Sequence, residues 1–159
     1  MSYITVLGIG NILLSDEGFG VRVVEELQKC CKFPEEVEVL DGGTLGLDLL
    51  RFIKGTKKLV LLDAVDGGKE PGTLYHLTGD DVSAYFHGQV SLHELGIKDI
   101  LTDLELTDKK VEEVVIIGVQ PLSLEVGLEL TPLIQGKVQA AVHAVKEELA
   151  RWKVVITSG

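Results

Sequence analysis

The sequence predicts an α/β fold: a three-layer sandwich with a mostly parallel central sheet of about five strands and helices on both faces. Short apolar runs alternate along the chain with segments of helical period, the pattern of strands and helices around a parallel sheet. Residues 59–62 are four consecutive large aliphatics inside the run 58–65, as expected of a strand covered on both faces. We therefore expect 58–65 to be the central strand. A length of 159 residues suits one domain spanning residues 1–159.

Five apolar runs are expected to form strands, and most of them stop at a glycine, an aspartate or a proline. These runs are residues 3–7, 37–40, 58–65, 73–77 and 114–119. Helical periodicity predicts helices over residues 16–31, 45–54, 91–101 and 134–152. The last of these has the clearest period, with Pro132 near its start. Residues 154–156 fit either a short edge strand or a tail.

Charge and composition exclude several classes of protein. The formal net charge of −10 predicts an acidic surface that repels nucleic acid. The uncharged opening stretch, residues 1–15, is interrupted by glycines, is too short to span a membrane and lacks the basic start of a secretory signal. We expect no membrane partner and a cytoplasmic protein. Cys30 and Cys31 are neighbours inside an expected helix, where they are badly placed to bridge each other, so no disulfide framework is expected.

The loop after the first expected strand is the first candidate site. Residues 8–10 begin like a dinucleotide-binding fingerprint, but Leu13 stands where its third glycine belongs. Asp16 and Glu17 then enter the start of the expected helix, where they would repel a phosphate and attract a cation. The alternative is that both acids only complement the helix dipole behind a Ser15 cap.

Two further acids follow expected strands. Asp63 comes directly after four aliphatics, and burying a carboxylate there is costly unless loop amides or a metal ion compensate it. Asp41 follows the second strand in an Asp-Gly-Gly sequence, which is ordinary turn chemistry and is also where a ribose-binding acid would stand. In open α/β sheets, ligands bind outside the carboxyl ends of the strands, so both positions are candidates for a site.

His93 could complete a metal site. Ser91 and Glu94 have the spacing of a capping box, which places His93 in the first turn of a helix, where the imidazole stays neutral and can bind a metal. A structural or merely exposed histidine is the alternative. Together, Glu17, Asp63 and His93 would offer two oxygen ligands and one nitrogen ligand to a borderline divalent ion, with coordination positions left open.

Five motifs in order carry a resemblance to a known family. They are residues 7–14 with 16–21, then 40–44, 62–64, 91–96 and 118–121. In these motifs, across nearly the whole chain, the sequence resembles the nickel–iron hydrogenase maturation endopeptidases. The resemblance implies an endopeptidase that removes the C-terminal extension of a hydrogenase large-subunit precursor after nickel has been inserted.

The resemblance also implies roles for particular residues. Glu17, Asp63 and His93 match the nickel-binding trio, and the nickel is supplied by the substrate precursor. Asp41 matches a further acid important for activity, and Asp16 an acidic position beside the ligand, so Asp41 or Asp16 is the expected general base. We expect a free protein that is monomeric, with the hydrogenase precursor as its partner.

Two other functions are consistent with parts of the sequence. A nucleotide-binding, Rossmann-like domain is favoured by residues 8–10 and Asp41, although Asp16 and Glu17 argue against it. A noncatalytic nickel-binding chaperone would use the same acidic site without cutting a peptide bond.

Overall fold

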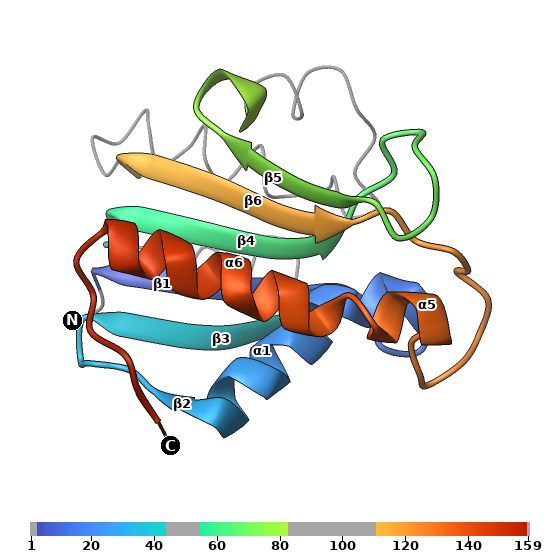
Figure 1. Ribbon diagram of the computed structural model, residues 1–159, viewed down its shortest axis with the longest axis horizontal. Coiled ribbons are helices and arrows are strands. Elements are labelled where there is room, and N and C mark those ends of the chain that lie inside the picture. Colours follow the sequence, from blue (N-terminus) through green and yellow to red (C-terminus); the bar gives the residue numbers. More distant parts are fainter. Residues whose placement is uncertain (1–2, 44–54, 83–110, 159) are drawn as a thin grey trace.

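The computed structural model describes residues 3–43, 55–82 and 111–158. Its centre is a five-stranded sheet with the order β3-β1-β4-β6-β5 (Figure 1). The neighbours from β3 to β6 are parallel, and β5 pairs antiparallel with β6 at the edge. The strands are β1 (Ile4–Ile9), β3 (Val37–Gly43), β4 (Lys58–Ala64), β5 (Leu74–Thr78) and β6 (Glu113–Val119). The prediction that β4 is central is confirmed.

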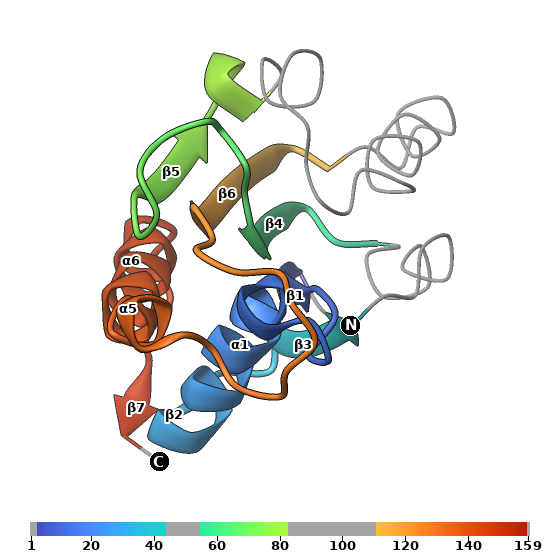
Figure 2. The ribbon, with the colours of Figure 1, turned by 90° about the vertical axis from the view of Figure 1, so that its right-hand side faces the viewer.

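Two helices cover one face of the sheet. The helices α1 (Phe19–Cys30) and α6 (Val138–Arg151) lie on the same side, as Figure 2 shows, and Gln139 of α6 donates a 3.4 Å hydrogen bond to Glu26 of α1. Their apolar faces meet the sheet in one core, because residues three and four apart share one side of a helix. Members of this core are Val6, Val23, Leu27, Val60, Leu62, Ile117, Val142, Val145 and Leu149.

The opposite face of the sheet is buried too. Leu7, Leu59, Leu61 and Ile116 form a second cluster there, each at most 3% exposed. β4 is thus buried on both faces, as its uninterrupted aliphatic run predicts. The helices predicted over 45–54 and 91–101 lie outside the described residues. The predicted α/β fold with a five-stranded, mostly parallel sheet and helices is confirmed.

Helix boundaries differ from the prediction at two places. Residues Ser15–Gly18 form a short 3-10 turn, η1, in which Ser15 has a left-handed φ of 53°, and α1 begins only at Phe19. The helix expected over 134–152 is divided into α5 (Pro132–Gln135) and α6, with Gly136 between them. Glycine is a poor helix former, so an interruption there costs little.

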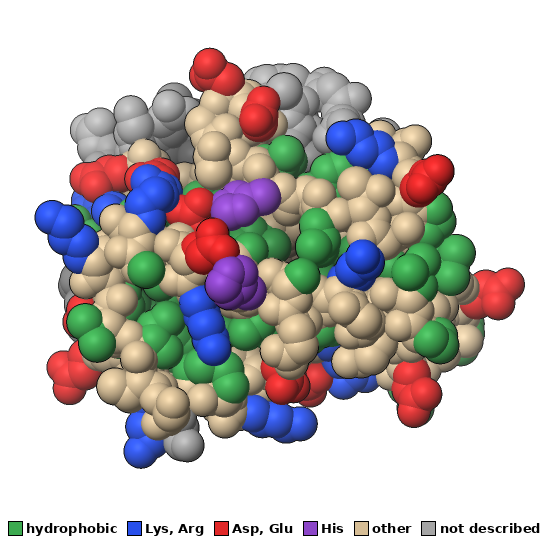
Figure 3. Space-filling view, in the orientation of Figure 1, with side chains coloured by type: hydrophobic (Ala, Val, Ile, Leu, Met, Phe, Trp, Pro, Cys, Tyr) green, Lys and Arg blue, Asp and Glu red, His purple; other side chains and the backbone are tan. Residues whose placement is uncertain are grey.

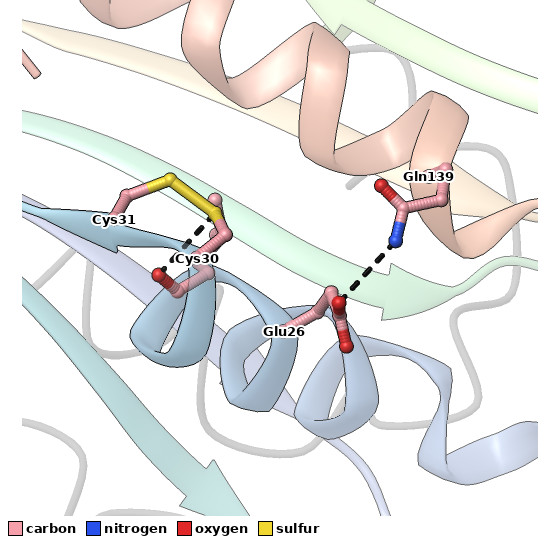
Figure 4. Close-up of a disulfide and its surroundings, with 5 residues drawn as sticks. Glu26, Cys30, Cys31 and Gln139 are labelled. Atoms are coloured by element: carbon pink, nitrogen blue, oxygen red, sulfur yellow. Dashed lines mark hydrogen bonds between the residues drawn. A yellow bond between two sulfur atoms is a disulfide. The ribbon is translucent and has the colours of Figure 1, made fainter. Parts of the chain in front are cut away.

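The two cysteines form a disulfide bond with each other, contrary to the prediction (Figure 4). That prediction assumed that both residues were helical. In the structure Cys30 ends α1, whereas Cys31 has extended backbone angles and begins β2 (Cys31–Lys32). The short β2 pairs antiparallel with β7 (Thr157–Ser158), so the segment 154–156 leads into a two-residue strand.

None of the described helices combines the length and the apolar composition needed to cross a membrane.

Candidate functional site

The candidate site lies at the carboxyl ends of the central parallel strands. β1 has β3 on one side and β4 on the other, so the strand order reverses at β1. Asp41 of β3 is opposite Gly8 of β1, and Leu62, which immediately precedes Asp63 in β4, is opposite Gly8 on the other side. The two predicted aspartates therefore flank the end of β1, at the position where open α/β sheets bind ligands.

Asp63 and Asp41 differ in burial. Asp63 is 2% exposed, and its carboxylate accepts a 2.8 Å hydrogen bond from the backbone N–H of Ala64. Asp41 is exposed. Because side chains alternate along a strand, Asp63 shares the face of Leu61, whereas Asp41 shares the opposite face with Val39. A ligand that contacts both carboxylates must therefore lie across the end of the sheet.

Glu17 is held at the same edge by a tight backbone contact. It lies in η1, which follows β1 and contacts β4, the strand that carries Asp63. Gly10 has a φ of +140°, and a Cβ atom built on it would lie 2.0 Å from the carbonyl oxygen of Glu17. Only glycine lets the backbone of residue 10 come this close to the backbone of Glu17, so Gly10 helps to set the position of η1 relative to the end of β1.

The structure brings the elements of two of the three predicted metal ligands to one edge. Among residues 3–43, 55–82 and 111–158, no three acidic, histidine or cysteine side chains are close enough to hold a metal ion. His93, the third predicted ligand, lies outside these ranges.

The first glycine of the partial dinucleotide fingerprint, Gly8, serves helix packing. A Cβ atom on Gly8 would lie 2.4 Å from the carbonyl oxygen of Gly20 in α1, and one on Gly20 would lie 2.1 Å from the carbonyl oxygen of Leu62. These contacts let the start of α1 touch the backbones of β1 and β4. Close helix–strand packing thus accounts for Gly8 without a bound phosphate.

Asp16 fixes a distant loop, which neither interpretation of the sequence anticipated. Its side chain is fully buried, and Oδ2 accepts hydrogen bonds of 2.9 Å from the backbone N–H groups of Leu122 and Ser123. Oδ1 accepts a 2.8 Å bond from the N–H of Thr131, whose hydroxyl also contacts both carboxylate oxygens. Asp16 therefore ties η1 to the segment between β6 and α5.

The predicted Ser15 cap is wrong. No side-chain cap bond is formed at the start of η1 or of α1. The Ser15 hydroxyl instead donates a 2.6 Å hydrogen bond to the carbonyl oxygen of Glu125. Both polar side chains of the Ser15-Asp16 pair thus hold the β6–α5 segment rather than the first turn of a helix.

Gln120 is an organising residue that the sequence analysis missed. It is 7% exposed, and its Oε1 accepts hydrogen bonds from the Tyr75 hydroxyl (2.7 Å) and the Gly67 N–H (2.9 Å), while its Nε2 donates to Asp66 (3.1 Å). It holds the loop after β4 against the end of β6. Burial raises the pKa of the Tyr75 hydroxyl, which keeps this donor protonated. A polar residue directly after the apolar run of β6 is the signal that could have identified Gln120.

Comparisons with known proteins agree with this fold. A family model described as hydrogenase maturation protease, HycI, matches residues 21–148. The hydrogenase expression/formation protein HupD of Rhodobacter capsulatus is 40% identical over 98% of this chain and 75% of its own length. The hydrogenase 2 maturation protease of Escherichia coli is 41% identical over 89% of this chain and 87% of its own length.

Solved structures give the same result. The hydrogenase maturating endopeptidase HybD of Escherichia coli superposes with a TM-score of 0.92 at 38% identity, covering 99% of this chain and 98% of that one. The maturation protease HybD of Thermococcus kodakarensis gives a TM-score of 0.77 at 26% identity, covering 92% and 98%. The chain belongs to the hydrogenase maturation protease family, and it is a hydrogenase maturation endopeptidase.

Proposed function

We propose that this endopeptidase removes the C-terminal extension from a nickel–iron hydrogenase large-subunit precursor after nickel insertion. The observation that carries the proposal is the near-complete match to an endopeptidase of this kind, 99% of one chain on 98% of the other. The acidic edge at the end of β1 supports it, because Glu17, Asp41 and Asp63 are suited to a cationic group on the substrate.

The proposed recognition element is the nickel ion of the precursor, which is part of the substrate. Glu17, Asp63 and His93 would bind it together with ligands from the precursor, since oxygen and imidazole ligands suit a borderline divalent ion. Only a loaded precursor offers that ion, so this binding selects loaded substrate over empty substrate. The shared edge of η1 and β4 supports the participation of Glu17 and Asp63.

Asp41 is the better candidate for the general base. The sequence allowed either Asp41 or Asp16, but the carboxylate of Asp16 is fully buried and occupied by donors from Leu122, Ser123 and Thr131. Asp41 is exposed to water at the end of β3. In the proposed step Asp41 accepts a proton from the water that attacks the scissile carbonyl, and the proton then passes to the leaving amine.

Asp16 has a positioning role in this proposal. It fixes η1, and therefore the backbone of Glu17, relative to the β6–α5 segment. Holding a ligand in place before the substrate arrives lowers the entropic cost of forming the productive complex.

The experiment that tests the function mixes the purified protein with nickel-loaded and nickel-free precursor and measures precursor mass. We expect loss of the C-terminal extension from the loaded form alone. Unchanged mass of the loaded precursor would contradict the protease function and favour a chaperone. The variant His93→Ala should stop processing, and His143→Ala is its matched control, because His143 is an exposed residue of α6 that pairs with Glu147. Normal processing by His93→Ala would contradict the nickel-binding role.

A further inference from the structure

An exposed apolar surface lies next to the candidate site. It consists of six large side chains from two segments that are far apart in the sequence. We call it the apolar rim, and it comprises Ile12 (38% exposed), Leu13 (55%), Leu122 (53%), Leu124 (39%), Val126 (87%) and Leu128 (65%). Single exposed apolar residues are ordinary in soluble proteins, but a cluster of them marks an interaction surface.

The two segments of the apolar rim are joined by their backbones. The N–H of Gly127 donates a 2.9 Å bond to the carbonyl oxygen of Leu13, and the N–H of Ser15 donates a 2.9 Å bond to the carbonyl oxygen of Gly127. Figure 2 shows the segment between β6 and α5 passing beside the loop that follows β1. The two loops therefore form one surface.

The apolar rim is fixed in place by polar contacts beneath it. Asp16 holds the backbone at Leu122 and Ser123, and Arg22 donates a 2.7 Å hydrogen bond to the carbonyl oxygen of Leu128. The apolar side chains thus point to solvent from an ordered support, and displacing the loop to bury them would break these bonds. A surface that is ordered in advance loses less entropy when it binds a partner.

The apolar rim is continuous with the candidate site and carries negative charge. Leu13 and Leu14 lead directly into η1, which carries Glu17. Glu125 and Glu129 are exposed within and beside the second segment. Figure 3 shows hydrophobic side chains together with acidic ones toward the right-hand edge, where the β6–α5 segment lies in Figure 1. The matching ligand is a polypeptide with apolar side chains next to positive charge.

We propose that the apolar rim is the docking surface for the precursor, and that it binds an apolar, positively charged segment of the substrate near the scissile bond. This inference rests on the proposed function, and it adds a contact that does not depend on nickel. Apolar contact provides affinity, and the glutamates orient the segment and reject acidic sequences.

The test compares Val126→Ser/Leu128→Ser with Val155→Ser on nickel-loaded precursor. Val155 is 75% exposed and lies beyond α6, so it controls for loss of a surface aliphatic. We expect the double variant to raise KM and the Kd for precursor about 10- to 100-fold with little change in kcat, since it removes binding that is equal in the ground and transition states. Unfolding curves matching the wild type show that the fold is kept.

A second variant tests the charge. Glu125→Lys/Glu129→Lys should also raise KM, whereas Glu147→Lys, at an exposed position of α6, should leave KM unchanged.

Wild-type KM in both rim variants would overturn the inference and leave the protease function standing. A wild-type protein that binds loaded precursor but does not cut it would overturn the protease function, and the rim would then be judged by Kd alone. If the rim substitutions only dissociate a dimer of the free protein in sedimentation, the rim is a self-interface and the inference is wrong.

Discussion

Replacing Asp16 with asparagine should destabilise the fold by about 2–4 kcal/mol. The carboxylate accepts bonds from three backbone N–H groups and one hydroxyl, and it is fully buried. An asparagine has one acceptor oxygen. If that oxygen keeps the bonds to Leu122 and Ser123, the amide nitrogen faces the N–H of Thr131 and leaves this donor unsatisfied.

The magnitude follows from these bonds. An unsatisfied buried donor costs about 1–3 kcal/mol, and a hydrogen bond to a neutral acceptor contributes roughly 1 kcal/mol less than one to a charged acceptor. Two weakened bonds and one lost bond alone would lower the free energy of unfolding by more than the expected value of about 2–4 kcal/mol. The neutral asparagine, however, avoids the cost of burying a charge, and this saving offsets part of the loss. For a domain of this size the loss corresponds to a fall in Tm of about 5–15 °C.

The assay is urea unfolding followed by circular dichroism, with Asp80→Asn as the control at an exposed acid. The control should unfold at the wild-type urea concentration, and Asp16→Asn at a clearly lower one. Coincident transitions for wild type and Asp16→Asn would refute the anchoring role. Asp41→Asn should show the reverse pattern, a wild-type transition with loss of peptidase activity.

Three further substitutions test the packing and the polar contacts. Gly20→Ala should lower stability by about 1–3 kcal/mol or more in urea unfolding, because its Cβ would lie 2.1 Å from a backbone oxygen of β4, and wild-type stability would show that α1 can move aside. Tyr75→Phe removes one donor to Gln120 and should cost about 1 kcal/mol; no loss would mean that the hydroxyl bond is unimportant. Burial raises the pKa of Glu113, but its hydrogen bond with Arg151 and the positive charges of Arg151 and Lys58 together outweigh burial and leave the pKa below the ordinary 4.5. The contribution of Glu113 is therefore present above pH 4.5 and is lost as the pH falls through its lowered pKa. Glu113→Gln should thus destabilise by at most about 1 kcal/mol at pH 7 and by less at pH 3. An equal effect at both pH values would contradict this.

The sheet was predictable because its signals are local. The cores of β1, β4 and β6 are runs of aliphatic or β-branched residues, and the uninterrupted run in β4 correctly indicated burial on both faces. The start of α1 was misplaced, because Asp16 and Glu17 suit a first helical turn by local preference. Ser15 has a left-handed φ there, and its hydroxyl bonds Glu125, a residue more than 100 positions away that local preference does not register.

The candidate site was predictable in position and less so in the role of its residues. The rule that ligands bind at the carboxyl ends of parallel strands singled out Asp41 and Asp63, and the structure places both beside the end of β1. The neighbouring acids at residues 16 and 17 look alike in sequence, yet their environments differ. Asp16 is buried and anchors the segment between β6 and α5, whereas Glu17 is only partly buried. The difference arises from the segment 122–131, and no local pattern relates this segment to η1. The prediction about Cys30 and Cys31 was wrong because it depended on the residue at which the helix ends.

In the proposed complex, acidic groups of this edge bind the nickel carried by the substrate. X-ray absorption at the nickel edge tests it directly, on loaded precursor frozen rapidly after mixing with wild-type protein or with Glu17→Gln. We predict that wild-type protein adds oxygen or nitrogen ligands to the first coordination shell of the nickel, and that Glu17→Gln adds fewer. A nickel spectrum that is unchanged by the wild-type protein would contradict the claim.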